Sequence, residues 1–233
     1  MIVQPEDIIF EKPRGFLVLD GANGAGKTTL MHKLVEHLRR QSLPVLATRE
    51  PGSTKLGQTL RKILLESEPD TVAPLTEVFL FAADRHNHVQ KIIQPALARR
   101  EMVISDRYYY STAAFQGYDR MLDLHAVSTI NSLAINGCLP DLLILLDLDP
   151  EEGLRRTKLR AESEGKDGFE SESIDFHHRL RQGFIELART CAEPVWVVDA
   201  EQTPDSIWRQ ILPIIERWSA AFQEVQRNCG EAP

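Results

Sequence analysis

The stretch Leu19–Leu30, LDGANGAGKTTL, decides the fold of this chain. Its residues Gly21–Thr28 fit the pattern GxxxxGK(S/T), follow an apolar run at 15–20 and open a segment with helical periodicity. Glycines in such a turn let backbone N–H groups surround phosphate oxygens, and the helix N-terminus adds its positive dipole end. We therefore expect a phosphate loop that binds a nucleoside triphosphate through Gly21, Ala22, Asn23, Gly24, Ala25, Gly26, Lys27, Thr28 and Thr29.

Two side chains at the end of this motif carry the expected chemistry. Lys27 would place a positive charge on the β- and γ-phosphates, and the Thr28 hydroxyl would ligate Mg²⁺. The sequence contains no guanine-reading NKxD, which argues against a GTPase. A motor would usually need a longer chain. The pattern that would indicate a small kinase is a set of arginines that face the loop.

Apolar strand-like runs alternate with helix-length segments along the chain. Strands are expected at 15–20, 44–50, 102–107, 141–148 and 194–199, and helices at 27–41, 59–66, 75–100, 150–161, 173–190 and 204–226. Pro213 is expected to kink or divide the last helix. Strands that are nearly continuously apolar, in alternation with helices, indicate a parallel sheet covered on both faces. We predict an α/β fold with a doubly wound, five-stranded parallel sheet, helices on both faces and ligands at the carboxyl ends of the strands.

Length and composition limit the number of domains that the chain can form. The chain has 233 residues, of which 42% are hydrophobic, and this suits a single domain over 1–233 with its core at about 15–215. The polar run around 161–173 predicts a small lid at about 155–172, although a solvated loop would have the same composition. The tail at about 227–233 is expected to be flexible.

Charge and cysteine content exclude several classes of partner. The formal net charge of −7 argues against a broad basic face for nucleic acid. The three cysteines show no metal-binding spacing, and we interpret them as reduced thiols of a cytoplasmic protein. No apolar stretch approaches the roughly 20 residues needed to cross a bilayer, so no membrane partner is expected.

Basic residues gather where the predicted strands end. Arg49 ends the second strand, and Asp106 with Arg107 ends the third, so all three are expected at the same edge as the phosphate loop. Phe81 and Arg85 lie four residues apart on the helix between these strands and share one face of it. Each residue alone has an ordinary interpretation, as a surface ion pair or a core aromatic. Together they indicate a site for an acceptor that carries its own phosphate.

With these motifs in place, the sequence resembles the thymidylate kinase family, which phosphorylates dTMP with ATP. The resemblance covers about residues 15–215 and rests on FLVLDGANGAGKTT, TREPGSTKLGQTLR, LFAADRHNHV, PALARREMVISDRYYYSTAAFQG, LPDLLILLDLDPEEGLRR and VVDAEQTPDSI. It implies a P-loop NTPase fold and a homodimer. It also implies transfer of the γ-phosphoryl group from Mg·ATP to dTMP, giving dTDP and ADP.

The resemblance implies roles for individual residues. Phe81 matches an aromatic that stacks on thymine, and Arg85 matches an arginine that bonds the base edge. Arg49 and Arg107 match arginines that hold the acceptor phosphate, and Asp106 matches an acid that organises Mg²⁺ together with Thr28. The remaining acceptor-binding residues that it implies are Asn23, Ser111, Phe115, Gln116 and Phe169. Phe115 would crowd the sugar 2′ position, and Pro51 matches a proline that is often cis.

The resemblance also places catalytic charge on the lid. Some members of the family carry an arginine inside the phosphate loop, but the corresponding residue here is Gly24. The charge is therefore expected from Arg156, Lys158 and Arg160, which would close over the transferring phosphoryl group. The expected catalytic set is Lys27, Asp106, Arg107, Arg156, Lys158 and Arg160. The alternative for the three lid cations is an exposed basic helix face.

Three positions depart from the family pattern. Asn23 stands where the family usually has an acid, Gly168 where it has a lid arginine, and Ser53 where it has a second glycine. Lys166 is the candidate to replace the lid arginine. These departures leave two alternatives open: a kinase for another pyrimidine deoxynucleotide, such as dUMP or a modified base, and a nucleotide-binding pseudoenzyme. The intact phosphate loop and strand-end arginines argue against the pseudoenzyme.

Overall fold

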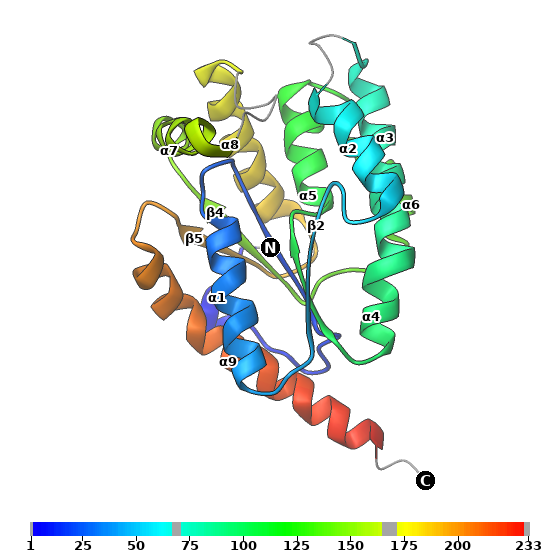
Figure 1. The fold of residues 1–233 in the computed structure, drawn as a ribbon, viewed down its shortest axis with the longest axis vertical. Helices are drawn as coiled ribbons and strands as arrows, with labels where there is room; N and C mark the ends of the chain where they lie inside the picture. The colour runs from blue at the N-terminus through cyan, green and yellow to red at the C-terminus, as the bar shows by residue number, and fades with distance from the viewer. Residues whose placement is uncertain (1, 67–70, 165–171, 231–233) are drawn as a thin grey trace.

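Five parallel strands form one sheet at the centre of the molecule (Figure 1). The computed structural model describes residues 2–66, 71–164 and 172–230, and the side chains of residues 66, 119, 160–164, 229 and 230 lie outside that description. The strands are β1 Phe16–Gly21, β2 Val45–Arg49, β3 Met102–Asp106, β4 Leu142–Asp147 and β5 Val195–Asp199. Their order is β2-β3-β1-β4-β5, and each neighbouring pair is parallel. The predicted five-stranded parallel sheet is confirmed.

Helices connect successive strands and cover both faces of the sheet. Their bounds are η1 Pro5–Asp7, α1 Lys27–Arg40, α2 Lys55–Glu66, α3 Pro74–His88, η2 Val89–Ile93, α4 Gln94–Ala98, α5 Tyr109–Thr112, η3 Ala113–Asp119, α6 Leu124–Ile135, α7 Pro150–Glu164, α8 Ile174–Thr190 and α9 Pro204–Gly230. Of these, η1 is a 3₁₀-helix, while η2 and η3 are π-helical. Within the described residues, no helix is both long enough and apolar enough to span a membrane.

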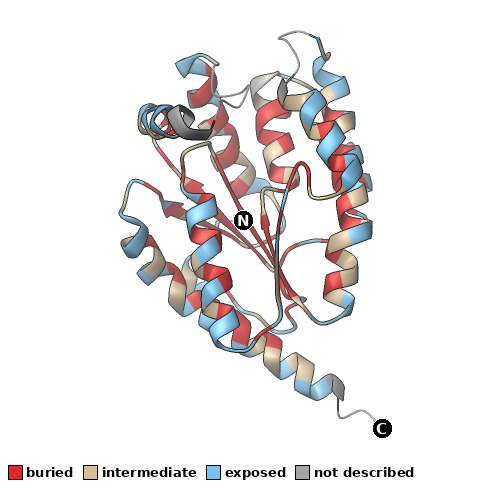
Figure 2. Ribbon diagram, viewed as in Figure 1, coloured by how far each residue is buried: buried red, intermediate tan, exposed pale blue. Residues whose placement is uncertain are grey.

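The core consists of two main apolar layers, one on each face of the sheet. The strands are largely buried, and the helices are buried on one side and exposed on the other (Figure 2). Side chains alternate along β1: Leu17 and Leu19 belong to one layer, whereas Phe16 and Val18 belong to the other. The first layer is completed by α1 and α9, and the second by η2, α5, η3 and α8. The helix residues of the first layer include Leu30, Leu34, Leu38, Ile211, Ile215 and Trp218. The four-residue spacing of the α1 leucines therefore marks the buried face of that helix.

Four features differ from the sequence-based expectations. Helix α2 begins at Lys55 rather than 59, because the Thr54 hydroxyl accepts a hydrogen bond from the Gly57 N–H at 2.9 Å and caps the first turn. The helix expected at 75–100 is interrupted by the π-helical segment η2. Helix α9 is continuous through Pro213 and is not divided there; it also runs on to Gly230, into the segment expected to be flexible.

The fourth difference is that no helix was expected between 109 and 135, where the structure has α5, η3 and α6. Helix α6 begins with a capping signal, since the Asp123 carboxylate accepts a hydrogen bond from the His125 N–H at 2.9 Å. It packs against α3 through buried residues that include Val127, Asn131 and Ala134. Residues of α5 and η3 line the site described next, and α6 packs against both of these segments.

The carboxyl ends of three neighbouring strands create the functional edge. Strand β1 leads into the phosphate loop, β2 ends at Arg49, and β3 ends at Asp106, in register with Arg49. β1 lies between β3 and β4, and the chain runs to β2 and β3 on one side of β1 before it crosses to β4 and β5 on the other side. Ligands of open α/β sheets bind in the crevice at such a switch point.

Candidate active site

The phosphate loop joins β1 to α1 and requires glycine at its first position. Gly21 has a φ of 133°, and a Cβ atom there would lie 2.4 Å from the carbonyl oxygen of Leu146 in β4. The ammonium of Lys27 donates to the carbonyl oxygens of Gly21 and Ala22 at 2.9 and 2.8 Å. The loop thus holds a buried positive charge at the start of a helix, which suits an anion.

Gly24 lies in the middle of the loop against the backbone of α7. Its φ is 81°, and a Cβ atom would lie 2.7 Å from the carbonyl oxygen of Gly153. The loop and α7 are therefore in close backbone contact, and no side chain fits at position 24 without a shift of one of them. This contact explains physically why the loop supplies no arginine of its own.

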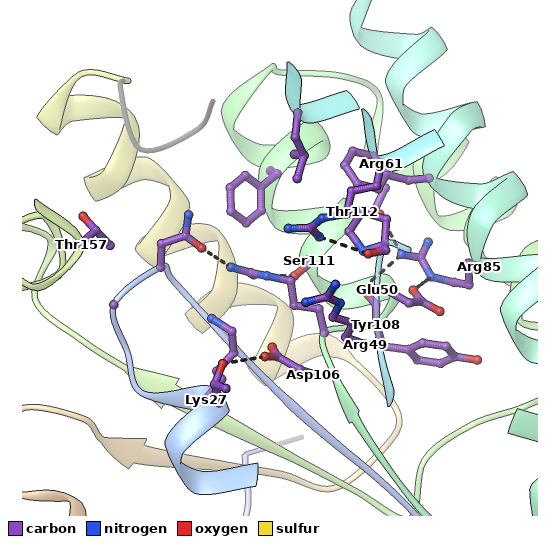
Figure 3. Close-up of a pocket in the computed structure, with 18 of the residues that line it drawn as sticks. Lys27, Arg49, Glu50, Arg61, Arg85, Asp106, Tyr108, Ser111, Thr112 and Thr157 are labelled. Carbon is purple, nitrogen blue, oxygen red and sulfur yellow. Dashed lines mark hydrogen bonds and ion pairs between the residues drawn. The ribbon is translucent and has the colours of Figure 1, made fainter. Parts of the chain in front are cut away.

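A cavity of about 850 Å³ opens beside the phosphate loop (Figure 3). It is lined by most of the residues that the sequence nominates. These are Asn23, Gly24, Gly26, Lys27, Thr28, Thr29, Arg49, Phe81, Arg85, Asp106, Arg107, Ser111, Phe115, Gln116 and Arg156. Gly21, Ala22, Ala25 and Lys158 do not line it. Phe169, with Lys166 and Gly168, lies outside the described residues, as does the side chain of Arg160.

Arg107 connects the third strand to the phosphate loop. Its Nη1 donates to the Gly21 carbonyl oxygen at 3.0 Å and to the Ser111 hydroxyl at 2.9 Å, and its Nη2 donates to Asn23 Oδ1 at 2.5 Å. Its φ of 72° is left-handed, a conformation that costs energy for a residue other than glycine and that clusters at functional sites. Asn23 therefore contacts an arginine of the cavity, at the position where an acid was expected.

Asp20 is a buried acid beneath this arginine, and the sequence analysis did not identify it. Its Oδ1 accepts from the Ser111 hydroxyl at 2.7 Å and lies 3.4 Å from Arg107 Nη1. Burial raises the pKa of the Asp20 carboxyl above its usual range, while the Arg107 charge acts in the opposite direction. The carboxylate therefore gives Arg107 and Ser111 a common anchor at the end of β1.

Asp106 and Thr28 present oxygen atoms suited to a divalent cation. The Thr28 hydroxyl lies 3.4 Å from Asp106 Oδ2, and Asp106 Oδ1 is buried without a hydrogen-bond partner among the described residues. The part of the chain that the structure describes contains no cluster of three or more His, Cys, Asp or Glu residues that could hold a metal. One carboxylate and one hydroxyl, completed by phosphate oxygens, are the ligands that Mg²⁺ takes in phosphoryl-transfer sites. The residues present therefore fit a metal that arrives with a nucleotide.

Arg85 is almost completely buried, with 1% of its surface exposed. Its Nε donates to Glu50 Oε2 at 2.8 Å and its Nη1 donates to Asn131 Oδ1 at 2.8 Å. Its Nη2 donates to the Tyr108 carbonyl oxygen at 3.2 Å and to the Thr112 hydroxyl at 3.0 Å. A guanidinium has five N–H groups, so these four bonds leave one N–H on Nη1 for a ligand in the cavity.

Glu50 fixes the position of Arg85 from the turn after β2. It is 4% exposed, and its second oxygen, Oε1, lies 2.8 Å from His88 Nδ1. The peptide bond between Glu50 and Pro51 is cis, as the resemblance implied. Asp84 lies close by, where burial first and the neighbouring Glu50 charge second raise the pKa of its carboxyl to about 6. A buried set of charged groups therefore supports the floor of the cavity.

Three further residues of the cavity, Phe115, Phe81 and Arg49, differ in how far their side chains are buried. Phe115 is buried against Phe176 and Phe184, and the Arg107 guanidinium lies 5.4 Å from the centre of its ring. Phe81 is partly buried, and Arg49 is exposed at the end of β2. The Arg49 side chain can thus reorient toward an anion in the cavity.

The lid cations have different surroundings. Arg156 Nε donates to Glu152 Oε1 at 2.7 Å, and Arg156 Nη1 donates to the Ala200 carbonyl oxygen at 2.9 Å. Lys158 is exposed and lies off the cavity wall. Of the two lid cations whose side chains are described, only Arg156 lines the cavity. Lys158 lies on an exposed helix face, as the alternative interpretation of these cations expected.

Several cavity residues were missed by the sequence analysis. They are Glu50, Arg61, Leu65, Tyr108, Thr112 and Thr157. Arg61 reaches the cavity from α2, where its Nη1 donates to the Pro51 carbonyl oxygen at 3.1 Å. A second cavity of about 460 Å³ lies on the other side of the phosphate loop, between α7 and the turn after β5, and is lined by residues such as Arg155 and Thr203. Its lining also includes Ala25 of the phosphate loop, which does not line the main cavity, and Arg156, which lines both.

Comparisons with known proteins agree with the site. The family model described as thymidylate kinase matches residues 19–211. A thymidylate kinase from Synechococcus sp. (strain JA-2-3B'a(2-13)) is 43% identical over 201 residues, covering 86% of this chain and 94% of the relative. One from Desulfosudis oleivorans is 40% identical over 206 residues, covering 87% and 96%. The solved thymidylate kinase of Ehrlichia chaffeensis superimposes with a TM-score of 0.68 at 28% identity, covering 86% of this chain and 97% of that one. The chain therefore belongs to the thymidylate kinase family.

Proposed function

We propose that the cavity at the carboxyl edge of the sheet is where this chain transfers the γ-phosphoryl group of ATP to the 5′-phosphate of dTMP, giving dTDP and ADP. The observation that carries the assignment is the convergence of Lys27, Arg49, Arg107 and Phe81 on one cavity. A phosphate loop alone suits many nucleoside triphosphatases. Arginines at the neighbouring strand ends provide for a second substrate that bears a phosphate, and the aromatic ring provides for its base.

On the donor side, the phosphate loop would hold the β- and γ-phosphates of ATP. Lys27 already lies under the loop, bonded to two carbonyl oxygens, so its charge is in place before a nucleotide binds. Thr28 and Asp106 would hold Mg²⁺, and the ion would neutralise charge on the phosphate oxygens. The partnerless, buried Oδ1 of Asp106 supports this role. The second cavity beside the loop has room for the rest of the donor nucleotide.

On the acceptor side, Arg107 would bind the dTMP phosphate from a fixed position and Arg49 from a movable one. Arg107 is held by Asp20, Ser111 and Asn23, which preorganises its fork for a phosphate. Phe81 would stack on the pyrimidine, and the last N–H of Arg85 would donate to a base carbonyl. The acceptor-binding roles of Ser111, Phe115, Gln116 and Phe169 belong to the same proposal.

Closure of the lid, at about 155–172, would complete the site. Arg156 lines the cavity and is held by Glu152, and we assign it the main catalytic charge of this segment. Lys158 and Arg160 would approach on closure. Positive charge brought onto the transferring phosphoryl group stabilises the transition state and excludes water.

The experiment that tests this function is release of ADP with Mg·ATP and a panel of nucleoside monophosphates. We expect dTMP to give the highest kcat/KM, and Lys27→Ala to lose at least a hundredfold in kcat because it removes a charge from the transferring phosphates. Lys91→Ala, at an exposed residue of η2, is the matched control and retains full activity. Stimulation by dUMP or another deoxynucleotide without any by dTMP would assign the acceptor site differently. Nucleotide binding without turnover of any acceptor would indicate a pseudoenzyme.

We further propose a cytoplasmic homodimer. Leu75 and Phe79 on α3, and Leu133 on α6, are large apolar residues with 43%, 54% and 74% of their surface exposed, and α3 packs against α6. Burial against a second copy of this surface would remove that apolar area from water. The Cys138 thiol is buried and forms no disulfide, which suits a reducing compartment. Light scattering is expected to give twice the chain mass for the parent and a single chain mass for Phe79→Asp; a monomeric parent would refute the dimer.

A further inference from the structure

The side-chain amide of Gln116 has one end bound and the other end without a partner. Gln116 lies in η3, is 1% exposed and lines the main cavity. Its Nε2 donates to Glu77 Oε2 at 3.3 Å, whereas its Oε1 is buried and accepts no hydrogen bond from the described part of the chain. A buried carbonyl oxygen without a partner costs free energy. Its presence in the wall of a ligand cavity therefore points to a ligand that donates a hydrogen bond to it.

Glu77 decides which end of this amide is bound. An ionised carboxylate has only acceptor atoms, so the amide nitrogen of Gln116 must face Glu77 and the amide oxygen must face away. Glu77 stands in the first turn of α3, one helical turn before Phe81, and does not line the cavity itself. Burial raises the pKa of the Glu77 carboxyl, and the hydrogen bond from Gln116 and then the Arg120 charge lower it. Within the described part of the chain, Gln116 is the residue that lines the cavity and hydrogen-bonds the Glu77 carboxylate.

The orientation of this amide matters for the choice between pyrimidines. Thymine and uracil carry an N3–H donor flanked by two carbonyl oxygens, whereas cytosine has an unprotonated N3 and an amino group at the same edge. A fixed amide oxygen accepts the N3–H of thymine, but it would oppose the N3 lone pair of cytosine. An amide that could turn over would instead offer its NH₂ group to cytosine, so holding it in one orientation excludes the wrong base.

We propose that Glu77 is a specificity-determining positioning residue, which locks the Gln116 amide so that Oε1 faces the acceptor and admits a base with an N3–H donor. The proposal rests on the assignment of this cavity to dTMP and deepens it. Arg85 complements the arrangement, because its one remaining N–H on Nη1 is a donor suited to a base carbonyl. The two residues together would read the adjacent donor and acceptor of an imide.

The test compares kcat/KM for dTMP and for dCMP in the parent, Glu77→Gln and Glu77→Leu. In Glu77→Gln the two amides can pair in either orientation, because each offers a donor and an acceptor. We expect the ratio of kcat/KM for dTMP over dCMP to fall about five- to tenfold, through a higher KM for dTMP and a higher kcat/KM for dCMP. The kcat for saturating dTMP stays within about twofold of the parent. Glu77→Leu leaves both amide ends without a partner and lowers the ratio similarly.

Matched controls separate this role from a loss of charge or of folding. Glu186→Gln removes a carboxylate of α8 that pairs with Arg189 away from the cavity, and it leaves the ratio unchanged. Glu77→Asp keeps a carboxylate and restores part of the discrimination. The parent also provides a test without mutation: N3-methyl-dTMP lacks the donor and loses at least a hundredfold in kcat/KM.

Two results would overturn the inference. One is a dTMP over dCMP ratio in Glu77→Gln equal to that of the parent, and the other is efficient turnover of N3-methyl-dTMP by the parent. A parent protein that does not phosphorylate dTMP would refute the proposed function itself. An active parent whose Glu77 variants keep the same selectivity would refute only the role of Glu77.

Discussion

Replacement of Glu50 by Gln tests whether the floor of the acceptor site is held by charge. Glu50 and Arg85 are both more than nine-tenths buried, and their ion pair is 2.8 Å long. The same carboxylate lies 2.8 Å from His88 Nδ1. Glutamine keeps the shape of the side chain but removes the negative charge and replaces one acceptor by a donor. The Arg85 guanidinium then remains buried without its counter-ion.

The expected cost follows from that burial. Removing one partner of a buried ion pair costs about 3–5 kcal/mol, since the remaining charge is left uncompensated. For a chain of this length, 1 kcal/mol corresponds to roughly 2–4 °C in Tm, so the variant should melt roughly 6–20 °C below the parent. The KM for dTMP should also rise, because Arg85 would no longer hold its last N–H toward the cavity.

Thermal unfolding followed by circular dichroism, at one protein concentration and pH, measures this effect. Glu101→Gln is the matched control, since it breaks an equally short ion pair with Arg99 that is open to solvent and contributes little. A melting temperature of Glu50→Gln as high as that of Glu101→Gln would refute the reasoning that the buried pair supports the site.

Three further predictions test the phosphate loop, the buried carboxyl group of Asp84 and the lid. Gly24→Ala should lower both kcat and Tm, because its Cβ would meet the Gly153 carbonyl oxygen at 2.7 Å; unchanged kinetics would show that α7 moves freely. The pKa of the Asp84 carboxyl is about 6 in the folded chain, so this group binds its proton more tightly in the folded chain than in the unfolded one. Its contribution to the free energy of unfolding is therefore present below about pH 4 and is lost as the pH rises through 6. Asp84→Asn should therefore gain stability over the parent at pH 7.5 and not at pH 4, by up to about 3 kcal/mol in denaturant titrations. Arg156→Ala should reduce kcat by at least tenfold and Lys158→Ala by less, in steady-state assays; equal losses would assign both residues to the lid chemistry.

Much of the fold could be predicted from the sequence because the pattern is strong there. Leu30, Leu34 and Leu38 recur at helical spacing and are all buried, and the five apolar runs all form strands. The helices between 109 and 135 were missed because η3 is π-helical and does not follow the period of an α-helix. Helix α6 was signalled by its cap, Asp123, but its buried face includes a polar residue, Asn131.

The site was predictable to the extent that it depends on strand ends. Arg49 and Asp106 are the last residues of β2 and β3, Arg107 follows Asp106, and the ends of parallel strands meet at one edge. Arg61 could not be found in this way, because it reaches the cavity only through the packing of α2 on the turn that contains Pro51. The same holds for the hydrogen bonds of Arg85, because its four acceptors come from segments far apart in the sequence and leave one N–H on Nη1.

The measurement that tests the central claim most directly is the identification of the products from ATP, Mg²⁺ and dTMP by anion-exchange chromatography. The convergence of Lys27, Arg49 and Arg107 on one cavity predicts dTDP and ADP in equal amounts, without inorganic phosphate. Formation of ADP and inorganic phosphate without dTDP would contradict it, because water would then be the acceptor in place of dTMP.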